Sequence, residues 1–134
     1  MFDGENSKNN KSPNYKILLA DDDSSVRRFI EIILQRANYE VLTADDGLSA
    51  MKIALETKVD AIVTDAMMPH LTGFDLCRIL RQNSTYQNIP LIILSGFEKE
   101  AESNQADAYL TKGDNLKEEL LAILSKLLAQ TVLT

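Results

Sequence analysis

The amino-acid sequence predicts an α/β fold in which helices cover both faces of a five-stranded parallel sheet. Short apolar runs alternate along the chain with segments whose apolar residues recur every three or four positions. The runs are apolar throughout instead of alternating with polar residues, which is typical of strands that are buried on both faces of a parallel sheet. At 134 residues, the chain has room for one such domain.

Five short apolar runs are expected to form the strands. Each is followed by polar or glycine-containing sequence, which marks the end of the strand. Because crossovers between parallel strands are right-handed, few strand orders are open to five such strands. The predicted strands cover residues 16–20, 39–44, 61–64, 91–95 and 108–111.

The first and last helical segments carry the clearest amphipathic pattern. Ser24 or Ser25 is expected to cap the first helix. Its predicted apolar face consists of Val26, Phe29, Ile30, Ile33, Leu34 and Ala37. The face of the last helix consists of Leu116, Leu120, Ile123, Leu124 and Leu127. Two further helices are expected at 47–57 and 73–83, with Cys77 as a small buried group on the latter.

Composition and charge argue against several classes of function. With 14 Lys and Arg against 20 Asp and Glu, the net charge is -6, which disfavours direct nucleic-acid binding. No apolar run approaches the roughly 18 residues that span a bilayer. The first residues lack the apolar core of a secretory signal, so we expect a cytoplasmic protein without membrane insertion. Residues 1–14 are expected to form a flexible tail before a folded domain at 15–134.

Polar side chains stand at the ends of four predicted strands. They are Asp21, Asp22, Asp23, Asp65, Ser95 and Lys112. In a parallel sheet these groups meet at the carboxyl edge, where such folds bind their ligands. Carboxylate oxygens without His or Cys favour Mg²⁺. A lysine and a hydroxyl around a projecting carboxylate suit phosphoryl transfer through an aspartyl phosphate.

Four segments resemble the response-regulator receiver family. They read ILLADDDSSVRR, IVTDAMMPHLTG, IPLIILSG and ADAYLTK, and the DxxMPxxxG pattern at 65–73 is highly specific. The resemblance covers about residues 15–130. It implies a flavodoxin-like sheet with strand order 2-1-3-4-5, in a chemotaxis-regulator-like protein that a histidine kinase or phosphotransfer protein phosphorylates in two-component signalling.

The resemblance also implies roles for individual residues at the carboxyl edge. Asp65 matches the phosphoacceptor, and Asp21 and Asp22 match the acidic pair of the Mg²⁺ site. The backbone carbonyl of Met67 matches a further metal ligand beside Asp65, whereas Asp23 is not expected to bind the metal.

Three more residues match positions that respond to phosphorylation in this family. Ser95 matches the switch hydroxyl, Tyr109 the switch aromatic and Lys112 the invariant lysine. The resemblance implies a phosphoacceptor and not an enzyme, with at most self-phosphorylation from small donors and self-dephosphorylation.

Two departures from the family pattern bear on this site. Gly113 follows Lys112 where the family has proline, so we expect a looser loop around the lysine. Only twelve residues, 96–107, separate the fourth and fifth strands, so the fourth helix is expected to be very short, distorted or missing.

Two other functions stay open at this point. Asp21, Asp22 and Asp23 also read as a DxD pattern, which would suit a small Mg²⁺-dependent phosphohydrolase with Asp21 as nucleophile. Alternatively, the chain is a degenerate receiver that binds partners independently of phosphorylation. For the individual residues, Tyr109 could pack in the core, and the three aspartates could form a helix N-cap cluster.

As a switch, the protein would signal through a downstream protein or pass the phosphoryl group on in a relay. With the fourth helix reduced, we expect either that partners bind the first or the last helix or that the chain binds partners unlike those usual for the family. A stripe of Leu121, Leu128 and Val132 on the last helix predicts either a wide buried face or a dimer surface.

Overall fold

The computed structural model describes residues 14–96 and 105–133. The tail predicted at 1–14 lies outside the described residues except for Asn14. The same holds for residues 97–104, which make up most of the fourth crossover. The shortened fourth helix therefore stays a prediction.

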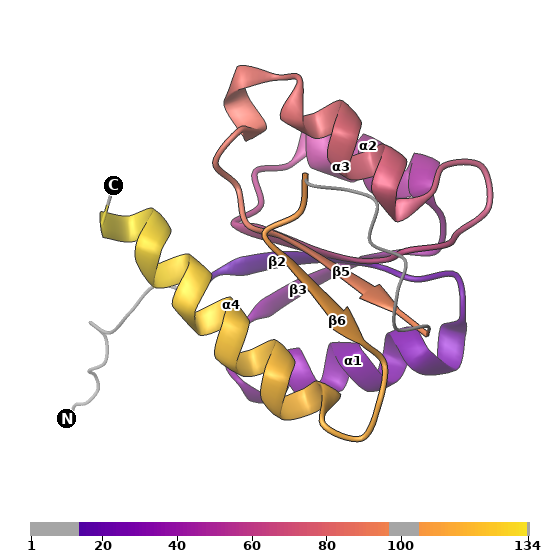
Figure 1. Cartoon of the computed structure of the whole chain (residues 1–134), viewed down its shortest axis with the longest axis vertical. Helices are drawn as coiled ribbons and strands as arrows, with labels where there is room; N and C mark the ends of the chain where they lie inside the picture. Colours follow the sequence, from indigo (N-terminus) through magenta and orange to yellow (C-terminus); the bar gives the residue numbers. More distant parts are fainter. Residues whose placement is uncertain (1–13, 97–104, 134) are drawn as a thin grey trace, which may run out of the picture.

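Five parallel strands form one sheet, which confirms the predicted fold class (Figure 1). Their order across the sheet is β3-β2-β4-β5-β6, which is 2-1-3-4-5 counted along the chain. All four strand pairs are parallel. The strands are β2 (Lys16–Ala20), β3 (Glu40–Ala44), β4 (Ala61–Asp65), β5 (Leu91–Ser95) and β6 (Ala108–Thr111).

Helices cover both faces of the sheet, as Figure 1 shows. One face packs against α1 (Ser24–Arg36) and α4 (Leu116–Leu133). The other face packs against α2 (Gly47–Glu56) and α3 (Gly73–Arg81), and the short 3-10 helix η1 (Ser84–Tyr86) follows α3. Within the described residues, no helix combines the length and the apolar character needed to cross a membrane.

The continuous apolar strands feed two separate cores. In β2, Leu18 and Ala20 point into the core beneath α2 and α3, whereas Ile17 and Leu19 point into the core beneath α1 and α4. All four side chains are fully buried. Because successive strand residues face opposite sides, a strand covered on both faces needs an apolar residue at every position.

The start of α1 confirms the N-cap alternative for the aspartates at Asp23, whereas the predicted caps Ser24 and Ser25 are wrong. Asp23 caps the helix in place of Ser24 or Ser25, and its carboxylate accepts hydrogen bonds from the backbone N–H groups of Ser25 and Val26. A carboxylate also interacts favourably with the positive end of the helix dipole, which favours Asp over Ser here. Phe29 is not part of the core, because 57% of its surface is exposed.

The last helix spans Leu116–Leu133 and buries part of the predicted stripe, of which the Val132 side chain lies outside the described residues. Leu128 belongs to the core under α1 and α4, and Leu121 is half-buried against it. The wide buried face thus accounts for Leu128, and a dimer through this helix stays a prediction.

Cys77 lies in the core on α3, as expected for a small apolar group. Burial raises the pKa of its thiol to about 12. The thiol is therefore uncharged at neutral pH and is not a nucleophile in the folded protein.

Gly73 allows α3 to start directly against the end of β4. A Cβ atom at Gly73 would lie 2.2 Å from the backbone oxygen of Asp65. The N–H of Gly73 also donates to the carbonyl of Ala66 at 2.9 Å, which closes the loop between the strand and the helix. This close approach is the physical reason for the glycine that ends the DxxMPxxxG pattern.

We predict that Gly73→Ala lowers the free energy of unfolding by about 1–3 kcal/mol, since the new methyl group forces α3 away from β4. Urea denaturation followed by circular dichroism measures this change. Gly113→Ala is the matched control, because a Cβ atom there meets nothing within 4 Å and the backbone φ is not positive. Equal losses in the two variants would contradict the steric explanation.

Candidate functional site

The parallel register brings the predicted site residues together at the carboxyl ends of the strands. Asp21 follows β2, Asp65 ends β4, Ser95 ends β5 and Lys112 follows β6. Asp65 pairs with Leu94, and Ser95 pairs with Thr111, so the four strand ends are level. These residues come from positions up to 91 apart in the sequence and meet at one edge of the sheet.

Three carboxylates form the acidic part of the site. Each of Asp21, Asp22 and Asp65 offers an oxygen, and these oxygens all lie within 4.8 Å of one another. Asp21 is buried, Asp65 is partly exposed and Asp22 is exposed. The cluster is therefore open to solvent on one side only.

Lys112 joins the two less exposed carboxylates. Its ammonium nitrogen lies 2.9 Å from Oδ2 of Asp21 and 3.0 Å from Oδ1 of Asp65. The side chain of Lys112 is itself 19% exposed, so water screens these ion pairs only in part. Three carboxylates and one ammonium leave two negative charges at the site, which one divalent cation would neutralise.

The pKa values of this group reflect burial and close charges. Burial raises the pKa of Asp65, and the nearby charges of Asp21 and Asp22 raise it further, against the opposing hydrogen bond from Lys112. For Lys112, burial alone would lower the pKa, but hydrogen bonds to Asp21 and Asp65 outweigh it and the pKa rises. Lys112 therefore stays protonated, while the ionised form of Asp65 is disfavoured.

The backbone around Asp21 is held by several hydrogen bonds. The N–H of Asp23 donates to Oδ1 of Asp21 at 3.0 Å, and the N–H of Asp21 donates to the carbonyl of Ala44. The guanidinium of Arg27 donates to the carbonyl oxygen of Asp21 at 2.8 Å. Sequence reasoning did not find this role of Arg27, because a side chain that binds a backbone carbonyl leaves no recognisable pattern.

Thr64 is a second residue that sequence reasoning missed. It is fully buried immediately before Asp65, and its hydroxyl donates to the carbonyl of Asp65 at 3.0 Å. The hydroxyl also lies 3.9 Å from the sulfur of Met68. These contacts restrain the peptide that carries the acidic side chain.

The oxygens present fit a hard divalent cation such as Mg²⁺. Carboxylates are the preferred ligands of that ion, and no His or Cys lies in the cluster of Asp21, Asp22 and Asp65. The side chain of Met67 is 58% exposed, so it does not fill the acidic cluster. A role for its backbone carbonyl as a metal ligand stays a prediction.

Ser95 and Tyr109 both lie near the site, with different surroundings. Ser95 is buried, and its carbonyl accepts a hydrogen bond of 2.7 Å from the N–H of Lys112. Tyr109 packs edge-on against Phe74 of α3, with ring centroids 6.0 Å apart and an interplanar angle of 83°. This contact agrees with the plain packing interpretation of Tyr109, and the switch roles of both residues stay predictions.

Two loops next to the site show how it is bordered. After Lys112, the N–H of Gly113 donates to the carbonyl of Thr111 at 2.9 Å, so the glycine sits in a tight turn. On the other side, Nδ1 of His70 lies 3.2 Å from Oδ2 of Asp46, which caps α2. His70 is a solvent-facing loop residue, as 61% of its side chain is exposed.

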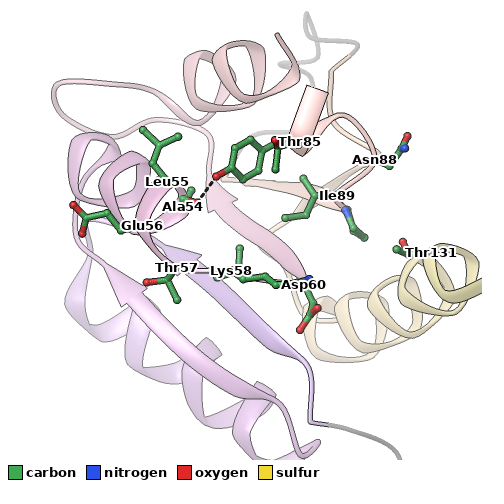
Figure 2. Close-up of a pocket in the computed structure, with 13 residues that line it drawn as sticks. Ala54, Leu55, Glu56, Thr57, Lys58, Asp60, Thr85, Asn88, Ile89 and Thr131 are labelled. Carbon is green, nitrogen blue, oxygen red and sulfur yellow. Dashed lines mark hydrogen bonds between the residues drawn. The ribbon is translucent and has the colours of Figure 1, made fainter. Parts of the chain in front are cut away.

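A pocket of about 500 Å³ lies away from this site. Figure 2 shows that residues of the segment before β4 and of the segment before β5 line it, so it opens at the amino ends of the strands. The hydroxyl of Tyr86 donates to the carbonyl of Ala54 at 2.8 Å and joins the two sides. The acidic cluster lies at the opposite edge of the sheet.

Comparison with known proteins agrees with this geometry. The family model of the response regulator receiver domain matches residues 17–125. Protein PilG of Pseudomonas aeruginosa is 35% identical over 116 residues, which cover 83% of this chain and 85% of PilG. The chain spans about half the length of several longer relatives.

Solved structures of a response regulator and of a receiver domain are also similar to this chain. The chemotaxis response regulator CheY4 of Vibrio cholerae has a TM-score of 0.76 and 35% identity, covering 86% of this chain and 99% of that one. The receiver domain of the sensor histidine kinase PA1611 of Pseudomonas aeruginosa has a TM-score of 0.79 and 27% identity, covering 87% and 99%. That structure contains a magnesium ion coordinated in its active-site cleft.

We predict that Asp65→Asn raises the free energy of unfolding at neutral pH in buffer with EDTA. Because the folded-state pKa of Asp65 is raised, its ionisation favours the unfolded chain. The stability gained by Asp65→Asn is therefore present above the folded-state pKa of Asp65. It shrinks as the pH falls toward the pKa that Asp65 has in the unfolded chain. Urea denaturation across a pH series measures it, with the exposed Asp114→Asn as control. A destabilised Asp65→Asn at neutral pH would refute this reasoning.

Proposed function

The chain belongs to the response regulator receiver family of two-component signalling, and on this premise we propose that it accepts a phosphoryl group on Asp65 in a Mg²⁺-dependent reaction. One observation carries the proposal. The Asp65 carboxylate lies 3.0 Å from the Lys112 ammonium and within 4.8 Å of the Asp21 and Asp22 oxygens. A carboxylate beside a cation and a divalent-metal site is the arrangement that phosphoryl transfer to aspartate needs.

In the proposed step, an Oδ atom of Asp65 attacks the phosphorus of a phosphohistidine or of acetyl phosphate. The new O–P bond forms as the P–N or P–O bond to the donor breaks, and the imidazole or acetate leaves with the bonding electron pair. Lys112 keeps its proton and moves little to meet an oxygen of the incoming phosphoryl group, since its ammonium already lies 3.0 Å from Asp65. Because the ammonium charge of Lys112 already lies beside Asp65, it does not have to be repositioned during the reaction.

The metal would be held by Asp21, Asp22 and Asp65, with the Met67 carbonyl as the further ligand that the family implies. When bound, Mg²⁺ supplies positive charge against the phosphoryl oxygens. Ser95 would then donate its hydroxyl to the phosphoryl group. The movement of Ser95 would be coupled to a movement of Tyr109 on β6, whose ring packs against Phe74 in this structure.

The two alternative functions fit the geometry less well. Asp21 is 1% exposed, and its two oxygens already accept hydrogen bonds from the Asp23 N–H and the Lys112 ammonium, so it is poorly placed as a nucleophile. A degenerate receiver would be expected to lose part of the site. Here the acidic residues and the lysine are present and in contact, which supports a phosphoacceptor over a pure binding module.

We further propose that the protein is a cytoplasmic switch and that α1 and α4 receive the phosphodonor. Both helices start at the carboxyl edge of the sheet, α1 after Asp23 and α4 shortly after Lys112. Between them lies a groove of about 350 Å³. Its lining combines apolar side chains with two cations and consists of Phe29, Ile32, Ile33, Arg36, Ala37, Lys117 and Leu121.

This groove suits a helix of a histidine kinase or phosphotransfer protein that carries acidic residues beside apolar ones. Phe29 is the exposed aromatic residue of the groove and would be its anchor. The response would pass to a downstream protein, or the phosphoryl group would pass on in a relay.

We predict that acetyl phosphate with Mg²⁺ adds one phosphoryl group to the wild-type protein and none to Asp65→Asn. Intact mass spectrometry followed by peptide mapping of the borohydride-reduced acyl phosphate locates the site. Phosphate on Asp21 would favour the phosphohydrolase instead. A wild-type protein whose amide NMR spectrum does not respond to Mg²⁺ with beryllofluoride would favour the degenerate receiver.

We predict that Phe29→Ser slows phosphotransfer by at least about tenfold, because the anchor of the groove is lost. Phosphorylated histidine phosphotransfer proteins are first tested for transfer to the wild type, and an active donor is then used with the variant. Leu55→Ser on α2 is the matched control, since Leu55 is 56% exposed and Phe29 57%. Labelling by acetyl phosphate should stay unchanged in both variants. Equal slowing by Leu55→Ser would place the docking surface elsewhere.

A further inference from the structure

Arg81, the last residue of α3, makes an unusual number of hydrogen bonds far from the acidic site. Its side chain is 14% exposed and donates five hydrogen bonds of 2.8–3.0 Å. Three carbonyls accept from Nη1. Because this nitrogen has two hydrogens, at least one hydrogen is shared between two acceptors. Guanidinium hydrogen bonds of this kind are charge-assisted and stronger than neutral ones.

The partners of Arg81 lie in two segments that lead into neighbouring strands. The carbonyls of Tyr86, Gln87 and Ile89 belong to the segment before β5. The carbonyl of Gln105 and the carboxylate of Asp107 belong to the segment before β6. One side chain therefore joins the beginnings of β5 and β6.

Asp107 completes this connection. Its Oδ2 accepts both from Nη2 of Arg81 and from the N–H of Leu91, the first residue of β5, at 2.9 Å each. The N–H of Asp107 in turn donates to the carbonyl of Leu91 at 2.8 Å. Arg81 and Asp107 thus fix which residue of β6 stands beside which residue of β5. We refer to the pair as the Arg81–Asp107 clamp.

β6 needs such a clamp because few other contacts define its register. It has four residues and pairs only with β5 among the described strands, and no residue of β6 is fully buried. A slip of two residues would keep every side chain on its own face. It would move Lys112 by about 7 Å along the strand, beyond reach of both Asp21 and Asp65.

We propose that the Arg81–Asp107 clamp positions Lys112 for phosphoryl transfer by holding β6 in register from the opposite end of the sheet. The proposal rests on the proposed function of Asp65. Arg81 contacts none of the reacting groups, so it is a positioning residue that acts through the strand. The hydrogen bond from the Lys112 N–H to the Ser95 carbonyl belongs to the same pairing of β5 with β6, at the carboxyl ends of the two strands.

Arg81→Met tests the proposal, because it keeps the bulk of the side chain and removes all five hydrogen bonds. Asp107→Asn is the second variant in case Arg81→Met does not fold. The matched control is Tyr86→Phe, which removes the hydroxyl bond to Ala54 in the segment before β5 and leaves β6 untouched. Phosphorylation by acetyl phosphate is timed at a temperature where circular dichroism shows all variants folded.

We expect Arg81→Met to slow phosphorylation by about tenfold to a hundredfold and Tyr86→Phe to leave the rate unchanged. In a Lys112→Ala background, Arg81→Met should add less than about a twofold effect, since its action passes through the lysine. If Arg81→Met slowed phosphorylation by the same factor in the wild-type and the Lys112→Ala backgrounds, the proposal would be overturned.

Amide hydrogen exchange gives a readout that does not require phosphorylation. In Arg81→Met, the Lys112 amide should exchange at least about tenfold faster relative to the Leu18 and Leu19 amides of β2, which report global stability. If all three amides lose the same protection, Arg81 contributes only general stability and the proposal fails. If the wild type takes up no phosphate, the proposed function fails, while the exchange data still decide whether the clamp holds Lys112.

Discussion

The ammonium group of Lys112 between Asp21 and Asp65 is the contact on which the rest of the site depends. It joins residues from three strands, and its two ion pairs are 2.9 and 3.0 Å long. The strand order makes this contact feasible, because β4 and β5 lie between β2 and β6 and the strand ends are level.

This arrangement costs stability and prepares the site for a ligand at the same time. Two buried or half-buried carboxylates stand beside a third, and burial, followed by the charges of Asp21 and Asp22, raises the pKa of Asp65 despite the hydrogen bond from Lys112. A divalent cation or a phosphoryl group bound here would remove part of this unfavourable charge balance. Perturbed charges of this kind are common at functional sites.

Much of the fold and most of the acidic site could be predicted from the sequence, because both leave a local pattern. Continuous apolar runs mark strands buried on both faces, and polar residues directly after them mark the edge where Asp65 and Lys112 lie. Phe29 was misassigned because its spacing fits the core face, while the packing of α1 against α4 leaves it at the border of a groove. Asp23 caps α1, which agrees with the N-cap alternative for the aspartates and not with the predicted caps Ser24 or Ser25.

The contacts that no pattern revealed join a side chain to backbone carbonyls outside its own helix. Arg27 binds the carbonyl of Asp21, and Arg81 binds carbonyls in the segments that lead into β5 and β6. Such bonds depend on where the backbone already lies, so they appear only once the fold is known. They also explain how a short edge strand can carry a residue as demanding as Lys112. The ion pairs hold β6 at its carboxyl end, and the Arg81–Asp107 clamp holds it at its amino end.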